Sequence, residues 1–285
     1  MSKNKYLYIS DLDGTLLNSH KQISEFTRQT LNALIDKGAH FSVATARTVA
    51  SSVKILSGLQ LNIPVILMNG VAIYDVLDHK YIKIETISPE TAYGILDILK
   101  KHNITGFLYS IANEKLNIYY ESLATAALQE YHDEHAIKYE KNFEHVTSFA
   151  NVIRKGEVIY FTLMGEQECL VVLLADLNKL PEIDAMLSSD VYIKNLWYLE
   201  IHSTNASKYN AVKYLGEYCG FDKIIGFGDN FNDVPLYKAC DEFFAVANAV
   251  DELKVMATGI IGDNNSDAVS KFIAARENSK RKGKT

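Results

Sequence analysis

The chain has 285 residues, of which 48% are hydrophobic and 22% are charged, and its formal net charge at pH 7 is −6. A chain of this length and composition can bury a substantial core, as one large domain or two modest ones, which excludes disorder throughout. The acidic balance argues against a nucleic-acid partner, because proteins that bind polyanions present basic faces.

The sequence also argues against membrane insertion and secretion. No apolar run approaches the length of a membrane span, and the chain enters a predicted strand by Tyr6 without the apolar core of a signal peptide. Its cysteines, Cys169, Cys219 and Cys240, are odd in number and lack metal-ligand spacing, which predicts reduced core residues. We therefore expect a cytoplasmic protein with no membrane partner.

The first part of the chain alternates between strand and helix patterns. Apolar runs predict strands at residues 6–9, 41–44 and 64–68, and amphipathic patterns predict helices at 24–38 and 49–59. Such alternation is typical of a doubly wound parallel sheet, an α/β fold of the Rossmann type.

After residue 70 the order changes. A hairpin at 71–84 and a helix at 88–102 precede a mixed run with strands near 107–109, 117–120, 158–163 and 191–193 and helices at 123–135 and 168–180. Alternation then resumes with a strand at 197–201, a helix to residue 219, strands at 224–227, 243–246 and 259–261, and helices at 252–256 and 268–275. We predict a core domain of residues 1–83 and 197–285, interrupted by an α+β domain at 84–196.

Two carboxylates follow the first strand directly, in Asp11-Leu12-Asp13-Gly14-Thr15. The carboxyl end of a parallel strand faces the crevice where open α/β sheets bind ligands, and Gly14 allows a sharp turn there. Adjacent acids repel one another unless a cation lies between them, which favours a Mg²⁺ site with a nucleophilic or acid/base carboxylate. The alternative is a plain turn in which Asp13-Gly14 supplies only a positive φ.

A second acidic cluster follows the strand at 224–227, where Asp229, Asn232 and Asp233 lie in Gly-Asp-Asn-Phe-Asn-Asp. It can meet the first cluster if the two strands are neighbours in one sheet, and oxygen ligands from separate loops are typical of hard cations. Alternatively, Asn232 or Asp233 only caps the helix that follows.

Two weaker signals complete a predicted phosphate site. Thr45 ends the strand at 41–44, where its hydroxyl and nearby backbone N–H groups can hold a phosphoryl oxygen. Lys208 lies near the start of a helix, where its ammonium can neutralise phosphoryl charge.

At these residues the chain resembles the haloacid-dehalogenase-like phosphatases, and within them the Cof-type phosphatases with a type IIB cap. The four motifs of that family occur in order, at Asp11–Thr15, at Thr45-Ala46-Arg47, at Lys208 and at Gly228–Asp233, and the resemblance spans essentially the whole chain. Ala46, Tyr209 and Ala247 depart from the pattern, because each replaces a usual glycine.

The resemblance implies roles for particular residues. Asp11 would be the nucleophile and Asp13 the acid and base; Mg²⁺ would be held by Asp11, the Asp13 backbone carbonyl and Asp229. Phosphate would be bound by Thr45, Ala46, Lys208 and Asn232. The residues that bind phosphate would be supported by Asp233, Arg47 and Asn69.

The expected function is Mg²⁺-dependent hydrolysis of small phosphate monoesters, such as sugar phosphates, through an aspartyl-phosphate. The partner would be a small phosphorylated metabolite, and the protein a monomer or weak homo-oligomer. A phosphosugar mutase of the phosphomannomutase kind is the alternative enzyme. A phosphometabolite-binding module without catalysis is the alternative from another class, and intact Asp11 and Asp13 argue against it.

Overall fold

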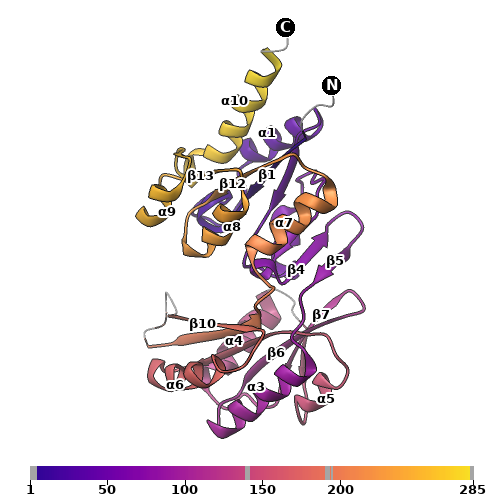
Figure 1. The fold of residues 1–285 in the computed structure, drawn as a ribbon, viewed down its shortest axis with the longest axis vertical. Coiled ribbons are helices and arrows are strands. Elements are labelled where there is room, and N and C mark those ends of the chain that lie inside the picture. The colour runs from indigo at the N-terminus through magenta and orange to yellow at the C-terminus, as the bar shows by residue number, and fades with distance from the viewer. Residues whose placement is uncertain (1–4, 139–141, 190–192, 194, 283–285) are drawn as a thin grey trace. The chain divides into compact units, whose positions relative to one another are not determined.

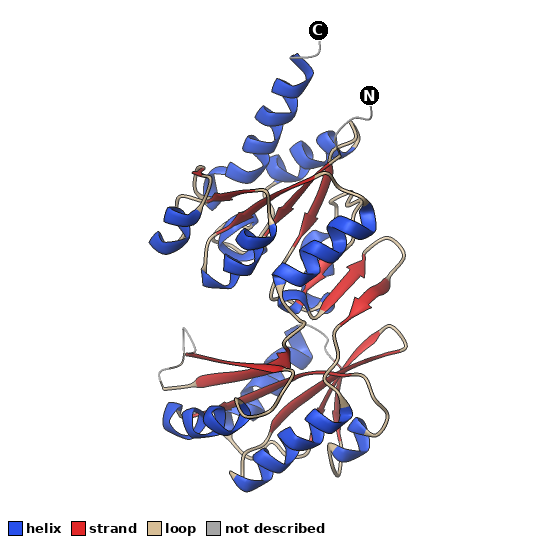
Figure 2. Ribbon diagram, in the orientation of Figure 1, coloured by secondary structure: helices blue, strands red, loops and turns tan. Residues whose placement is uncertain are grey.

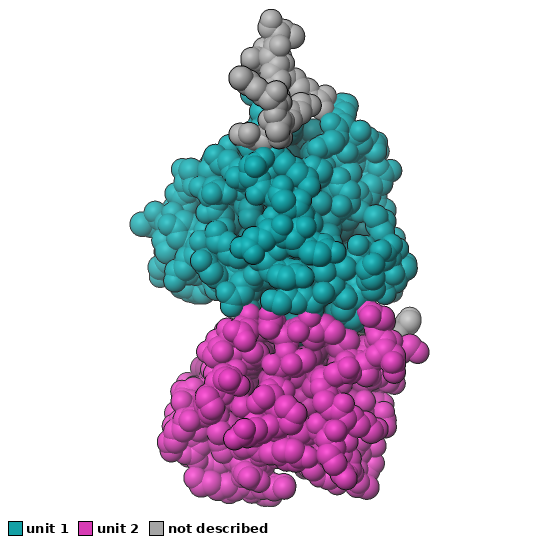
Figure 3. Space-filling model, turned by 45° about the vertical axis from the view of Figure 1, so that its right-hand side comes forward, with its two compact units in different colours: residues 1–83, 207–285 teal, residues 84–206 magenta. Residues whose placement is uncertain are grey.

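The structure, a computed structural model, describes residues 5–138, 142–189, 193 and 195–282. The chain divides into two compact units, shown in different colours in Figure 3. Unit 1 contains Met1–Lys83 and Ser207–Thr285, and unit 2 contains Ile84–Ala206.

Unit 1 is built on a five-stranded sheet in the order β14-β13-β12-β1-β2, and every neighbouring pair in it is parallel (Figure 1). Its strands are β1 (Tyr6–Ser10), β2 (His40–Val43), β12 (Lys223–Gly228), β13 (Glu242–Ala245) and β14 (Gly259–Ile260). Its central strands are almost fully buried, which explains why they read as continuous apolar runs. The predicted parallel α/β core is therefore confirmed.

Helices cover the sheet of unit 1 (Figure 2). They are α1 (Glu25–Ile35), α2 (Val49–Leu56), α7 (Lys208–Cys219), α8 (Val234–Ala239), α9 (Asp251–Met256) and α10 (Ala268–Lys282). The crossovers from β1 to β2 and from β12 to β13 run in opposite directions across the sheet. By the rule that such crossovers are right-handed, α1 and α8 lie on opposite faces. α1 packs against α10, and α7 packs against α8.

The strand order places β1 beside β12. β1 and β12 are neighbours in parallel register, with Ser10 opposite Phe227, and the connections that leave them diverge. A switch point of this kind is where open α/β sheets bind ligands. The segments that follow β1 and β12 therefore emerge side by side at the carboxyl edge of the sheet.

A small sheet, in the order β3-β4-β5, completes unit 1. It is formed by β3 (Val65–Leu67), β4 (Ala72–Asp75) and β5 (Lys80–Ile84). The strand predicted at 64–68 pairs antiparallel with β4, and one isolated parallel bridge, between Ala44 and Ile66, links it to the segment after β2.

Unit 2 has a six-stranded sheet in the order β10-β11-β9-β6-β7-β8, with helices packed on it. Its strands are β6 (Gly106–Ala112), β7 (Lys115–Tyr120), β8 (Asn142–His145), β9 (Val158–Gly165), β10 (Ile183–Ser189) and β11 (Trp197–Ser203). Its helices are α3 (Pro89–Lys101), α4 (Ala126–Lys138), α5 (Ala150–Ile153) and α6 (Gln167–Leu177). Buried side chains of α3, α5 and α6 form one hydrophobic core with one face of the sheet.

Several predictions about unit 2 differ from the structure. The strand assigned to the core from residue 197 is β11, which pairs antiparallel with β9 and β10, so this unit extends to Ala206 rather than 196. The sequence interpretation missed β8, α5 and β10, and residues 191 and 192 of one predicted strand lie outside the described residues.

All three cysteines are free thiols. Cys169 is exposed, so its predicted core position is wrong: it lies in the first turn of α6, off the stripe formed by Leu170, Leu173 and Leu177. In the part of the chain that the structure describes, no helix combines the length and apolar character needed to cross a bilayer.

One ion-pair network joins α10 to the sheet and leads to a prediction. Glu242 of β13 accepts hydrogen bonds from Arg276 of α10 at 2.5 and 2.7 Å and forms an ion pair with Lys223. The Arg276 hydrogen bonds, assisted by Lys223, lower the pKa of Glu242 to about 2. Because the folded-state pKa is depressed, this stabilisation is present above the unfolded-state pKa of about 4.3 and is lost as the pH falls toward 2.

We expect Glu242→Gln to lower the free energy of unfolding by about 1–2 kcal/mol at pH 7. Urea unfolding at pH 7 and at pH 3 measures this difference, which should shrink at the lower pH. Glu25→Gln is the control, because Glu25 is 71% exposed and contacts Arg28 at 3.7 Å. If Glu242→Gln lowers the free energy of unfolding equally at both pH values, the depressed pKa of Glu242 does not stabilise the fold.

Candidate active site

The segment after β1 forms a tight turn. Asp11 is extended and 4% exposed, and the turn Leu12–Leu16 closes with Leu17 N–H donating to the Leu12 carbonyl at 2.9 Å. Gly14 has a φ of +78°, and a Cβ there would lie 2.3 Å from Asp229 Oδ2. Only glycine therefore permits both the turn and the approach of Asp229.

Lys208 lies at the first position of α7, and its side chain is 1% exposed. Its Nζ donates to Asp11 Oδ1 at 2.6 Å and to Asp233 Oδ1 at 2.7 Å. Burial of an ammonium is costly unless it is paired, and here two buried carboxylates pair it. The Lys208 side chain is thus fixed between the acidic segments that follow β1 and β12.

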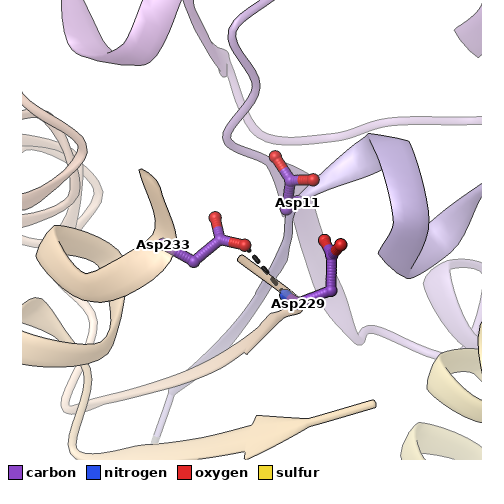
Figure 4. A group of neighbouring side chains, drawn as sticks. All are labelled: Asp11, Asp229 and Asp233. Carbon is purple, nitrogen blue, oxygen red and sulfur yellow. Dashed lines mark hydrogen bonds between the residues drawn. The ribbon is translucent and has the colours of Figure 1, made fainter. Parts of the chain in front are cut away.

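Asp233 and Asp229 lie in the segment after β12 (Figure 4). The Asp233 side chain is fully buried, and its Oδ2 accepts the backbone N–H of Asp229 at 2.9 Å and of Asn230 at 3.3 Å. The Thr15 hydroxyl donates to Asp229 Oδ1 at 2.8 Å. Asp11, Asp229 and Asp233 each offer one carboxylate oxygen, and these three oxygens lie within 4.8 Å of one another.

The charges of this cluster do not balance. Burial raises the pKa of Asp11, the neighbouring Asp233 and Asp229 carboxylates raise it further, and Lys208 opposes them. Burial also raises the pKa of Asp229 to about 6. Desolvation disfavours the ammonium of Lys208, but Asp11 and Asp233 outweigh it and raise the pKa of Lys208. Three carboxylates lie close together, and one ammonium pairs only two of them, an arrangement that a bound cation would relieve.

Asp13 has a different environment from Asp11. Its side chain is 46% exposed, and its two oxygens accept hydrogen bonds from Arg47 Nε and an Arg47 terminal nitrogen, both at 2.6 Å. The Thr45 hydroxyl accepts the Arg47 backbone N–H at 3.2 Å, and Thr45 itself is 1% exposed. The segment after β2 is therefore linked to the segment after β1 through a bidentate ion pair.

The other predicted residues have less direct positions. The Asn69 backbone N–H donates to the Thr45 carbonyl at 2.9 Å. Ala46 is exposed and Asn232 is half-buried in the turn Phe231–Asp233. The structure brings Asp11, Asp229, Asp233 and Lys208 together and pairs Asp13 with Arg47.

Two residues that form hydrogen bonds at the site were not among the predicted ones. Thr15 orients Asp229, as described above. Asn248 Nδ2 donates to the Gly14 carbonyl at 2.7 Å, and Asn248 Oδ1 accepts the Asn264 N–H at 3.0 Å. The signal for Asn248 is its place just after β13, one strand beyond the acidic segment of β12.

Residues 8–273 match the family described as haloacid dehalogenase-like hydrolase. The chain therefore belongs to the haloacid dehalogenase-like hydrolases, and it is an enzyme. This membership agrees with the resemblance seen in the four motifs.

Curated relatives align over nearly their full length. The 5-amino-6-(5-phospho-D-ribitylamino)uracil phosphatase YitU of Bacillus subtilis is 27% identical over 286 residues, covering 96% of this chain and 98% of the relative. The pyridoxal phosphate phosphatase YbhA of Escherichia coli is 24% identical, covering 92% of this chain and 95% of the relative.

Solved structures share the fold. A haloacid dehalogenase-like hydrolase from Bacteroides thetaiotaomicron superposes with a TM-score of 0.77 at 23% identity, covering 96% of this chain and 99% of that one. A structure described as a subclass IIB sugar phosphatase of this superfamily has a TM-score of 0.69 at 18% identity, with coverages of 96% and 99%.

Proposed function

We propose that this enzyme hydrolyses small phosphate monoesters with the help of Mg²⁺, through a phosphorylated Asp11. The observation that carries the proposal is the meeting of Asp11, Asp229 and Asp233 around Lys208 at the switch point of the sheet. Phosphoryl transfer through a covalent intermediate requires a nucleophile and nearby positive charge, which a carboxylate beside a cation site and a fixed ammonium would supply. The relatives named as phosphatases support the same reaction class.

The acidic cluster fits a hard cation. Asp229 is oriented by Thr15, and its Oδ2 would lie 2.3 Å from a Cβ on Gly14, so the glycine leaves room for this carboxylate. Both oxygens of Asp233 are already engaged, by Lys208 and by backbone N–H groups, so we assign it to orienting rather than ligating. Asp11, the Asp13 carbonyl and Asp229 would hold Mg²⁺, which offsets the negative charge of the approaching phosphate when it is bound.

The Asp11 carboxylate would attack phosphorus, forming an O–P bond as the bond to the leaving alcohol breaks. Lys208, Thr45 and Asn232 would hold the phosphoryl oxygens, and Lys208 carries the positive charge that the transition state needs. Attack of water on the phosphorus of phospho-Asp11 would then release inorganic phosphate and restore the carboxylate. Splitting the reaction in this way replaces one difficult displacement by two easier ones.

Asp13 is the proposed acid and base. It would give a proton to the leaving oxygen and later take one from the attacking water. Its side chain is accessible, unlike that of Asp11, and Arg47 fixes its position through two hydrogen bonds. The accessible carboxyl is thus suited to proton transfer, and the buried one to nucleophilic attack.

We infer a phosphorylated metabolite as the substrate. Sugar phosphates are our first choice, and the names of the relatives add phosphorylated ribitylaminouracil and pyridoxal phosphate to the compounds worth testing. A mutase would instead convert mannose 1-phosphate into the 6-phosphate without releasing phosphate.

The deciding experiment measures phosphate release by the purified full chain from this panel, with Mg²⁺, with excess chelator and with Ca²⁺. We expect activity with Mg²⁺, none in chelator, and recovery when Mg²⁺ is restored. Ca²⁺ should support little turnover, because its larger and looser shell misplaces the nucleophile. Full activity in chelator would refute the metal site, and isomerisation without phosphate release would favour the mutase.

A further inference from the structure

The turn Met68–Gly70 follows β3 and has an unusual backbone. Three consecutive residues have positive φ angles: 51° at Met68, 54° at Asn69 and 106° at Gly70. Left-handed backbone at non-glycine residues is uncommon and persists where the surroundings impose it. The contacts of this turn with its surroundings therefore indicate its role.

On one side, the turn is bonded to the segment after β2. Met68 N–H donates to the Arg47 carbonyl at 3.1 Å, and Asn69 N–H donates to the Thr45 carbonyl at 2.9 Å. Asn69 Oδ1 is buried and accepts no hydrogen bond from the residues that the structure describes. Backbone conformation, rather than the Asn69 side-chain oxygen, therefore ties the turn to Thr45 and Arg47.

On the other side, the turn lies against the start of α7. A Cβ on Gly70 would lie 2.2 Å from the carbonyl oxygen of Ser207, 2.3 Å from its carbonyl carbon and 2.8 Å from its nitrogen. All three are backbone atoms, so no side-chain rotation could relieve the overlap. Ser207 is the N-cap of α7, its hydroxyl accepting the Asn210 N–H at 3.1 Å, and Lys208 follows it directly.

We propose that Gly70 is a positioning residue that sets Lys208 against the phosphate-binding segment at Thr45. This inference rests on the proposed function, in which Thr45 and Lys208 hold the same phosphoryl group. Ser207 is also where the chain re-enters unit 1, and contact with Gly70 defines the start of α7 within that unit. No side chain of the turn needs to touch the substrate for this role.

The test compares Gly70→Ala with Gly38→Ala. Both glycines have positive φ, 106° and 89°, so both variants bear similar backbone strain, but a Cβ on Gly38 would meet nothing within 4 Å. Displacing Lys208 by a fraction of an ångström should weaken phosphate binding and lower kcat, by up to about 10²-fold. Gly38→Ala should retain wild-type kinetics.

Three measurements separate positioning from general damage: the inhibition constant of inorganic phosphate, the Mg²⁺ concentration for half-maximal activity, and the thermal unfolding midpoint. We expect Gly70→Ala to weaken phosphate inhibition at least ten-fold and to weaken Mg²⁺ activation much less. Of the proposed Mg²⁺ ligands, the Asp11 side chain contacts Lys208, but Asp229 is held by Thr15. Equal phosphate inhibition in Gly70→Ala and Gly38→Ala overturns the proposal, as does an equal loss of Mg²⁺ and phosphate affinity.

If Gly70→Ala does not fold, a second pair of variants tests the proposal. Asn69→Ala strains the same turn without the backbone overlap, and Asn103→Ala changes an exposed asparagine with a similar φ of 52° after α3. Weaker phosphate inhibition in Asn69→Ala alone supports the proposal, and equal inhibition in both variants overturns it. A wild-type chain that hydrolyses no phosphate ester would refute the proposed function instead.

Discussion

Replacing Asp11 with asparagine will abolish phosphate release while the protein stays folded. The amide is nearly isosteric with the carboxylate but is a poor nucleophile, and loss of a covalent nucleophile costs at least about 10⁴-fold in kcat. Lys208 keeps its hydrogen bond to Asp233 Oδ1 in this variant, so its ammonium remains paired. Burial disfavours the charged form of Asp11, so a neutral amide in that position is tolerated by the fold.

The measurement is kcat for the best substrate of the panel, with circular dichroism and thermal unfolding as checks of the fold. Asp36→Asn is the matched control, because Asp36 is an exposed aspartate of the same unit, at the C-cap of α1. It should turn over substrate at the wild-type rate. Activity of Asp11→Asn within ten-fold of wild type would rule out Asp11 as the nucleophile.

Replacing Asp13 with asparagine should lower kcat roughly 10²–10⁴-fold for a sugar phosphate, the usual contribution of a positioned acid and base. Asparagine can still accept a hydrogen bond from Arg47, so the link between the segments after β1 and β2 should survive in part. The loss should be smaller for p-nitrophenyl phosphate, because its leaving group departs without protonation.

The comparison of the two substrates tests the assigned role directly. Each is assayed with wild type, Asp13→Asn and Asp36→Asn under the same Mg²⁺ concentration. An equal fractional loss for both substrates would show that Asp13 does not protonate the leaving group. A smaller loss for the activated ester is the result we expect.

Most strands of the parallel sheet in unit 1 could be predicted from the sequence, because their signal lies within each strand. Strands buried on both faces need continuous apolar residues, and β1 and β12 show such runs immediately before Asp11 and Asp229. Two acidic clusters after two such strands could be joined because parallel sheets gather their carboxyl ends at one edge.

The elements missed in unit 2 had weaker local signals. β10 alternates in burial: Ile183, Ala185 and Leu187 face the core, and Asp184 and the exposed Met186 lie between them. Because Met186 is apolar, the sequence shows Ala-Met-Leu at this point and the period-two pattern is weak. β8, at Asn142–His145, contains a single apolar residue, so only its pairing with β7 makes it a strand. β11 was assigned to the wrong domain because the residues of a strand do not specify the strand with which it pairs.

By itself, the sequence determined the family, and it determined the chemical types of the candidate site residues and the order in which they follow the strands. These depend on side-chain identity and spacing along the chain. Only the tertiary structure decided that Lys208 bridges Asp11 and Asp233, that Arg47 pairs with Asp13, and that Gly70 lies against Ser207. Each of these contacts joins segments far apart in sequence, and their distances exist only once the sheet has set the strands side by side.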